Sequence, residues 1–203
     1  MEMVMEPRTG LQVPASNQGF PLVGTSARSV TFLGFLTYAF ALYRDSGKWN
    51  VQESARVIDD LIQDPAGSIV RIVTYRAIDC THFCSSINSG AVPRMKKHLE
   101  TQGVDPKTAT EEAELVGNEF RSLFKSKDLP VNTAVDFRIS KLPSQPSNTR
   151  ITIFINGEEQ GHIDGTLFTN AFVALYFGQE PRSKEIQAGV QACIDKKAAQ
   201  TKH

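Results

Sequence analysis

The alternation of apolar residues between residues 20 and 43 constrains the fold of this 203-residue chain more than any other feature. Residues 20–30 and 34–43 are predicted to be two neighbouring strands joined around Gly34. Large apolar or aromatic residues occupy alternate positions of the second strand: Leu36, Tyr38, Phe40 and Leu42. The residues between them are small: Thr37, Ala39 and Ala41. This small-residue face predicts that another part of the chain packs closely on it.

The two predicted strands carry one guanidinium, that of Arg28, and one phenol, that of Tyr38. If the strands form one hairpin, both side chains can lie near each other on the same face of the sheet. A guanidinium that faces an apolar layer is costly unless it is paired. Either an acidic side chain of the protein pairs with Arg28, or the head group of a ligand does. The planar fork of arginine matches a carboxylate, so the pattern predicts a site for an amphiphile with an anionic head. The alternative for Tyr38 is a tyrosine at the edge of the core, bonded to a backbone carbonyl.

Composition argues against several classes of function. The 22 basic residues equal the 22 acidic ones in number, so no basic face for nucleic acid and no affinity for an anionic membrane are expected. No apolar run reaches the length of a membrane-spanning helix, about 18 residues, so an integral membrane protein is not expected. Residues 1–19 lack the pattern of a secretory signal, and we expect them to be a flexible tail, or what remains of a trimmed targeting segment. One domain is then expected over residues 20–200.

The chain has three cysteines, Cys80, Cys84 and Cys193. An odd number without a secretory signal predicts free thiols in a reducing compartment. Cys80 and Cys84 flank His82, but no second cluster of cysteine and histidine could complete four ligands, so no metal site is expected. His82 is a candidate ligand for an iron, and a solvated or capped histidine is the alternative.

The next stretch of sequence predicts a helix that begins at Asn50 and ends before Pro65, and then a strand at 68–78. A helical stretch at 80–102 follows, divided by Gly90 and Pro93. Another helix is predicted from Asp105-Pro106 to about Lys127, and its inward-facing residues are Leu115, Val116, Phe120, Leu123 and Phe124. After these come a strand at 135–140, a loop at 141–148, a hairpin that turns at Asn156-Gly157, a helix from Thr166 to Gly178, and a last helix capped by Ser183. Strands and helices in separate runs predict an α+β fold with a largely antiparallel sheet.

Aromatic residues gather in the predicted helix that begins at Thr166. They are spaced so that several can share one face with Leu175: Phe168, Phe172, Tyr176 and Phe177. This group could form the wall of a pocket, and ordinary core packing is the alternative interpretation. The sequence contains no nucleophile elbow, phosphate loop or dinucleotide fingerprint.

Several stretches resemble, in the same order, parts of the chalcone isomerase-like family. The opening of that fold is matched by Leu22-Val-Gly-Thr-Ser-Ala-Arg28, Phe32-Leu-Gly and Tyr38-Ala-Phe-Ala-Leu-Tyr43. Its closing hairpin and helix pair are matched by Ile155-Asn-Gly-Glu-Glu-Gln-Gly-His-Ile-Asp-Gly, Phe172-Val-Ala-Leu-Tyr-Phe-Gly178 and Pro181-Arg-Ser-Lys184. The resemblance runs from residue 20 to residue 195. It implies an open-faced antiparallel β-sheet packed against a layer of helices.

The resemblance implies different roles in three branches of the family. Plant chalcone isomerases use an arginine, a threonine on the next strand, a Tyr/Lys/Asn set on a following helix, and a Ser/Thr on a late helix. Plant fatty-acid-binding members keep the arginine and have a tyrosine in place of the threonine. Fungal mitochondrial members keep the arginine and are associated with heme. Arg28 matches the shared arginine, Tyr38 falls at the threonine position, and Leu175 stands at the Ser/Thr position. The helix set of the enzymes does not carry over to this chain.

From this resemblance we expect a non-catalytic protein that binds a hydrophobic carboxylate, either a fatty acid or heme. The implied ligand contacts are Arg28, Tyr38, Phe172, Leu175 and Tyr176, with His82 as the candidate axial ligand for heme alone; otherwise no cofactor is required. The alternative is a chalcone-flavanone isomerase, in which Arg28 would stabilise the developing enolate. A third possibility is an interaction protein that keeps only the fold. Thr31-Phe-Leu-Gly and Pro181-Arg-Ser-Lys184 resemble the fungal mitochondrial branch more than the plant enzymes. This resemblance implies a mitochondrion or another organelle, the cytoplasm is the alternative, and secretion is not expected.

Overall fold

A computed structural model describes residues 2–29, 36–45, 54–64, 66–124, 128–178 and 184–200. Its centre is a seven-stranded sheet in the order β11-β10-β9-β6-β5-β4-β3, and every pairing is antiparallel. The strands are β3 (Ser16–Asn17), β4 (Phe20–Ser29), β5 (Leu36–Arg44), β6 (Ser68–Thr74), β9 (Ala134–Leu142), β10 (Gln145–Ile155) and β11 (Glu158–Asp164). The predicted α+β class and antiparallel sheet are confirmed.

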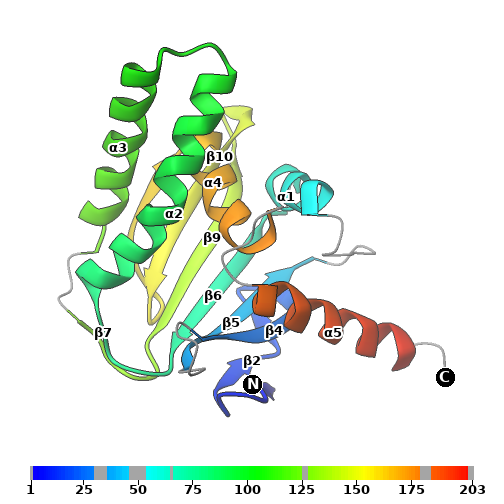
Figure 1. The fold of residues 1–203 in the computed structure, drawn as a ribbon. Helices are drawn as coiled ribbons and strands as arrows, with labels where there is room; N and C mark the ends of the chain where they lie inside the picture. The colour runs from blue at the N-terminus through cyan, green and yellow to red at the C-terminus, as the bar shows by residue number, and fades with distance from the viewer. Residues whose placement is uncertain are drawn as a thin grey trace.

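Most of the helices cover one face of this sheet (Figure 1). They are α1 (Ser54–Gln63), α2 (Cys80–Thr101), α3 (Pro106–Ser122), α4 (Thr166–Phe177) and α5 (Lys184–Gln200). Helix α4 packs between the sheet and both α1 and α2, while α3 packs on α2, and α5 crosses β4. The two short strands β7 (Ile78–Asp79) and β8 (Asp128–Leu129) pair beside the first turn of α2. This arrangement encloses the main hydrophobic core between the sheet and the helices.

The two faces of β5 have different surroundings, as its sequence predicted. Tyr38, Phe40 and Leu42 belong to the main core under the helices. Ala39 and Ala41 belong to a second cluster on the opposite face of the sheet. The parts of the chain that pack there include Val13, Phe20 and Leu22 from its N-terminal region. The prediction that another segment approaches the small-residue face is therefore confirmed.

The N-terminal residues differ from the flexible tail that we expected for residues 1–19. The strands β1 (Met3–Met5) and β2 (Gln12–Pro14) pair as a small hairpin, and β3 extends the large sheet. Val13 is fully buried against the back of the sheet, with Val4 and Leu11 packed around it. Strands of two or three residues are too short to give a periodic signal, and this hairpin is ordered by the sheet on which it packs.

Helix α2 is continuous, so the predicted division at Gly90 and Pro93 is wrong. Pro93 lies inside the helix on its exposed side. A proline at this point removes one intrahelical hydrogen bond, but it does not have to end the helix when both halves are held by packing. Ile87 and Met95, on either side of it, are buried in the main core.

The helix and turn signals with a specific chemistry are confirmed. Asp105 caps α3, and its carboxylate accepts hydrogen bonds from the backbone nitrogen atoms of Lys107 at 3.0 Å and Thr108 at 3.2 Å. Asn156 and Gly157 form the turn between β10 and β11 with φ angles of 50° and 86°. Both residues of such a turn need positive φ, which asparagine and glycine tolerate best.

Other predictions are corrected by tertiary context. Leu115, expected to face inward, is 70 % exposed on α3. The expected loop at 141–148 is mostly strand, because β9 and β10 continue to a short turn. The strand expected at 68–78 ends at Thr74, and β7 follows it separately. The turn at Gly34, the caps Asn50 and Ser183, and the matched stretches Phe32-Leu-Gly and 181–183 lie outside the described residues.

Two properties of the described residues bear on function. No helix in this part of the chain is both long enough and apolar enough to cross a membrane. No group of three or more histidine, cysteine or acidic side chains gathers there in a way that could hold a metal ion.

Candidate ligand-binding site

Strands β4 and β5 bring Arg28 and Tyr38 together. The two residues are direct partners in the antiparallel register, so their side chains leave the sheet on the same face. Nη1 of Arg28 donates a hydrogen bond to the Tyr38 hydroxyl at 3.3 Å, and the guanidinium carbon lies 5.9 Å from the centre of the Tyr38 ring. A shift of register follows Arg28 in β4, and such bulges redirect side chains at the end of a strand.

Arg28 has no carboxylate within ion-pair distance among the described residues, unlike other arginines of the sheet. On the opposite face, Arg71 binds Asp136 through two hydrogen bonds of 2.6 and 2.7 Å. Arg150 binds Asp164 in the same two-bond geometry. In the described part of the chain, therefore, the acidic partner that would make Arg28 a purely structural residue is not seen.

The guanidinium of Arg28 stays positively charged in this setting. Burial, the largest single cause, lowers its pKa, while the charge and the hydrogen bond of the Tyr38 oxygen atom raise the pKa. Smaller contributions from Tyr176 and Glu185 act in the same upward direction. The net result is a pKa above the ordinary value, so the side chain is a permanent cation beside apolar walls.

A small cavity borders this cation. Its volume is about 20 Å³, which is room for about one water molecule. The sheet contributes Arg28 and Tyr38, helix α4 contributes Leu175 and Tyr176, and helix α2 contributes Phe83, Ser86 and Ile87. Apart from the hydroxyl groups, the wall that the helices form is apolar.

The structure thus gathers four of the predicted ligand contacts, Arg28, Tyr38, Leu175 and Tyr176, around one cavity. The residues from α2 were missed. Phe83, Ser86 and Ile87 follow the i, i+3, i+4 spacing of one helix face, which is the signal that could have found them. The direction in which that face points depends on how α2 packs, and the sequence of α2 alone does not fix it.

Phe172 and His82 lie elsewhere. Phe172 is fully buried behind the cavity, with its ring centre 4.5 Å from that of Phe137 and 5.5 Å from that of Tyr176. His82 is exposed in the first turn of α2, where its backbone nitrogen donates to the capping carboxylate of Asp79 at 3.0 Å. Neither residue is part of the cavity wall.

A larger groove lies between α1, α2 and α4, and none of its residues was predicted from the sequence to contact a ligand. Its volume is about 510 Å³, within the usual range for small-molecule sites. Ile58, Leu167 and Ala171 give it an apolar floor, and α2 adds Lys97 and His98. Any binding experiment must therefore separate this groove from the cavity beside Arg28.

Comparison with known proteins agrees with the fold. No family model matches the chain. The antiparallel sheet and the helix layer agree with the expected chalcone isomerase-like fold, and the chain is similar in sequence and in fold to a plant fatty-acid-binding protein of that family.

A sequence comparison and a structure comparison both find the same relative. Fatty-acid-binding protein 1 of Arabidopsis thaliana is 25 % identical over an alignment 203 positions long, which covers 90 % of this chain and 67 % of that protein. The crystal structure of an Arabidopsis thaliana fatty-acid-binding protein matches with a TM-score of 0.69 and 22 % identity, over 96 % of this chain and 98 % of that one. This relative is named for fatty-acid binding, which is consistent with the expectation of a non-catalytic protein.

Proposed function

We propose that this protein binds a fatty acid, or a similar hydrophobic carboxylate, without transforming it. The observation that carries the proposal is the state of Arg28: a half-buried cation, hydrogen-bonded to Tyr38, without a carboxylate partner among the described residues. The guanidinium offers two parallel N–H groups to a carboxylate, and the Tyr38 hydroxyl can donate a further hydrogen bond. The names of the relatives point to the same ligand class.

The apolar wall suits the hydrocarbon chain of such a ligand. Leu175 and Ile87 present aliphatic surface, and Phe83 presents an aromatic ring. With a volume of about 20 Å³, the cavity does not hold an acyl chain as it stands. The ligand must therefore move side chains of α2 and α4 apart, and the apolar surface that it buries provides the driving force.

The isomerase is less well supported than the binding function. Ring closure needs several polar groups that position a phenolate. The α2 wall contributes one hydroxyl, that of Ser86, and α4 contributes Leu175 and Tyr176. Heme also carries carboxylates that Arg28 could bind, but a heme site needs an axial ligand, and His82 is exposed outside the cavity wall. An organellar location remains a prediction from the resemblance alone.

Native mass spectrometry of the purified protein, before and after incubation with sodium laurate, tests this proposal. We expect one bound fatty acid in the wild type and none in Arg28→Ala. Two control variants should keep the ligand: Arg150→Ala, which removes an exposed ion pair elsewhere, and Lys97→Ala, which removes a cation from the larger groove. Ligand loss in Lys97→Ala with retention in Arg28→Ala would move the site to the groove. An empty wild type after incubation would overturn the proposal.

A further inference from the structure

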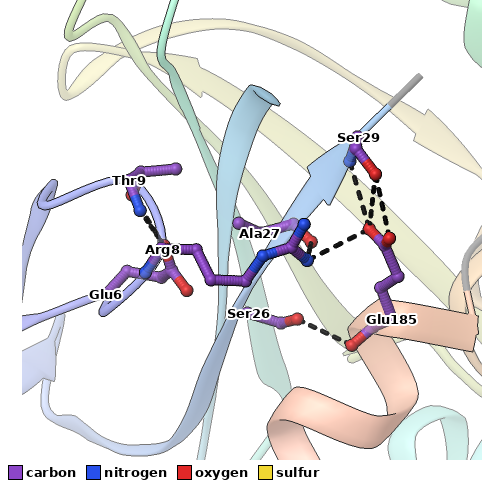
Figure 2. Close-up of polar contacts among 7 residues, drawn as sticks. All are labelled: Glu6, Arg8, Thr9, Ser26, Ala27, Ser29 and Glu185. Carbon is purple, nitrogen blue, oxygen red and sulfur yellow. Dashed lines mark hydrogen bonds and ion pairs between the residues drawn. The ribbon is translucent and has the colours of Figure 1, made fainter. Parts of the chain in front are cut away.

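A polar cluster joins the N-terminal region and the end of β4 to α5 (Figure 2). It consists of Arg8, Ser29 and Glu185, and we call these three residues the clasp. Oε2 of Glu185 accepts hydrogen bonds from Nη1 of Arg8 at 3.1 Å and from the backbone nitrogen of Ser29 at 3.2 Å. The Ser29 hydroxyl lies 2.9 Å from Oε1 and 3.0 Å from Oε2. Both oxygen atoms of the carboxylate are therefore occupied.

Arg8 reaches Glu185 from a turn that is stabilised independently of the clasp. Glu6 is almost completely buried, and its Oε2 accepts hydrogen bonds from the backbone nitrogen atoms of Arg8 at 3.1 Å and Thr9 at 2.7 Å. The Thr9 hydroxyl donates a further bond to the same oxygen at 2.7 Å. A fixed turn lowers the entropic cost of holding a long arginine side chain in one place.

The clasp holds the chain on both sides of Arg28. Nη1 of Arg8 also donates to the carbonyl of Ala27 at 3.3 Å, and Glu185 binds Ser29. The Ser26 hydroxyl donates to the carbonyl of Glu185 at 2.8 Å, which ties the first turn of α5 to β4. The segment that carries the ligand-binding cation is thus fixed by residues that the cavity itself does not include.

Glu185 is also the acidic residue whose charge acts on Arg28. Its electrostatic attraction contributes to the raised pKa of the Arg28 guanidinium. Because Glu185 binds Ser29, the neighbour of Arg28 in the chain, a released Glu185 carboxylate would compete with the carboxylate of a ligand for Arg28. In the structure, however, the Glu185 charge is compensated by Arg8 and its oxygen atoms are bound by Ser29.

We propose that Arg8 and Ser29 are positioning residues that hold the Glu185 carboxylate away from Arg28, so that the guanidinium stays available to the carboxylate of the ligand. This inference rests on the proposed fatty-acid site. It gives the N-terminal turn a role in ligand affinity, although that turn lies outside the cavity. It also predicts opposite signs for two substitutions: loss of Arg8 weakens ligand binding, and additional loss of the Glu185 charge restores it.

Isothermal titration calorimetry with sodium laurate tests this inference in the full chain. Arg8→Gln is expected to weaken binding about two- to fivefold, the range of a partly exposed ion pair. The double variant Arg8→Gln/Glu185→Gln should return close to wild-type affinity, and Arg8→Lys, which keeps the charge, should stay close to it. Arg150→Ala is the matched control for loss of an exposed arginine. Thermal unfolding of every variant checks that it is folded.

Two readouts separate this electrostatic role from simple loosening of the structure. The loss of laurate affinity in Arg8→Gln should become smaller when the salt concentration is raised from about 0.01 M to about 1 M, because the screening length then falls from about 30 Å to about 3 Å. It should also be absent for 1-dodecanol, which has no charge. If the double variant binds laurate as weakly as Arg8→Gln, or if salt does not change the effect, the inference is overturned.

Arg28→Ala, measured in the same series, distinguishes this failure from that of the proposed function. Unchanged laurate affinity in Arg28→Ala contradicts the proposed function. Loss of affinity in Arg28→Ala together with unchanged affinity in Arg8→Gln contradicts the role of the clasp and leaves the fatty-acid site intact.

Discussion

At the scale of single residues, the ion pairs of the sheet show why Arg28 is a functional candidate. Arg71 and Arg150 each bind an aspartate with two hydrogen bonds, and this pairing explains their presence on the sheet. Arg28 has the Tyr38 hydroxyl as its hydrogen-bond acceptor in the described structure. Burying a cation without an anionic partner costs desolvation free energy, and a carboxylate bound at Arg28 would offset that cost.

Cys84 provides a residue-scale prediction that depends on pH. Burial, and to a lesser degree Cys80 and Asp79, raises the pKa of the Cys84 thiol from 9.0 to about 12. In the unfolded chain this thiol ionises near 9.0, so unfolding above that pH releases a proton. The contribution of Cys84 to stability is therefore complete below 9.0 and is lost as the pH rises towards 12.

Urea unfolding at about pH 7.5 and about pH 10 measures this effect on either side of the ordinary thiol pKa. The Cys84→Ala variant is expected to lose less of its free energy of unfolding between the two values than the wild type does. Cys193→Ala, in which a half-buried cysteine is replaced, is the control and should follow the wild type. A Cys84→Ala variant with the same alkaline loss as the wild type would show that Cys84 does not titrate on unfolding.

At the scale of elements, helix α2 is well packed but contains a proline that lowers its stability locally. Its buried residues form a wall of the cavity and of the core along most of its length. Pro93 interrupts its hydrogen bonding on the exposed side, where it also borders the larger groove. The helix continues through this point because packing outweighs the lost bond.

Pro93→Ala should therefore stabilise the protein, because alanine restores a backbone N–H and removes a steric clash. The expected gain in the free energy of unfolding is about 1–3 kcal/mol. Pro106→Ala is the control, since proline at the first position of a helix costs nothing, and its effect should stay within about 0.5 kcal/mol. Urea denaturation of both variants gives the comparison. A loss of stability in Pro93→Ala would contradict a strained helix interior.

At the scale of the whole molecule, the sheet is covered on both faces, by helices on one and by the N-terminal hairpin on part of the other. The small residues Ala39 and Ala41 leave room for Val13, which is fully buried. The hairpin therefore belongs to the folded domain and carries Arg8 to the clasp.

Val13→Ala tests the contribution of this hairpin to the stability of the whole protein. Removal of two buried methyl groups is expected to lower the free energy of unfolding by about 1.5–3 kcal/mol. Val131→Ala, at a position 51 % exposed, should change it by less than about 0.5 kcal/mol. Equal effects of the two substitutions in chemical denaturation would argue that the hairpin does not pack on the sheet in solution.

The sequence predicts those features that are governed by local chemistry. Alternation in β5 indicated its two faces, and the adjacency of two strands indicated that Arg28 and Tyr38 would meet. It did not predict Ser86 in the cavity wall or Val13 in the second cluster. Their positions depend on how a helix turns and where a short hairpin docks, and both are decided by contacts between segments far apart in the chain.

The central claim is that the Arg28 guanidinium binds the carboxylate of the ligand. The most direct test follows the carboxyl resonance of laurate labelled with ¹³C at that carbon, bound to the wild type and to Arg28→Ala, as the pH is lowered. Contact with a cation favours the charged form, so the carboxyl pKa of laurate bound to the wild type should lie below the pKa of free laurate. In any laurate that still binds to Arg28→Ala, the pKa should rise to that value or above it. Identical titration curves for laurate bound to the two proteins would contradict the claim.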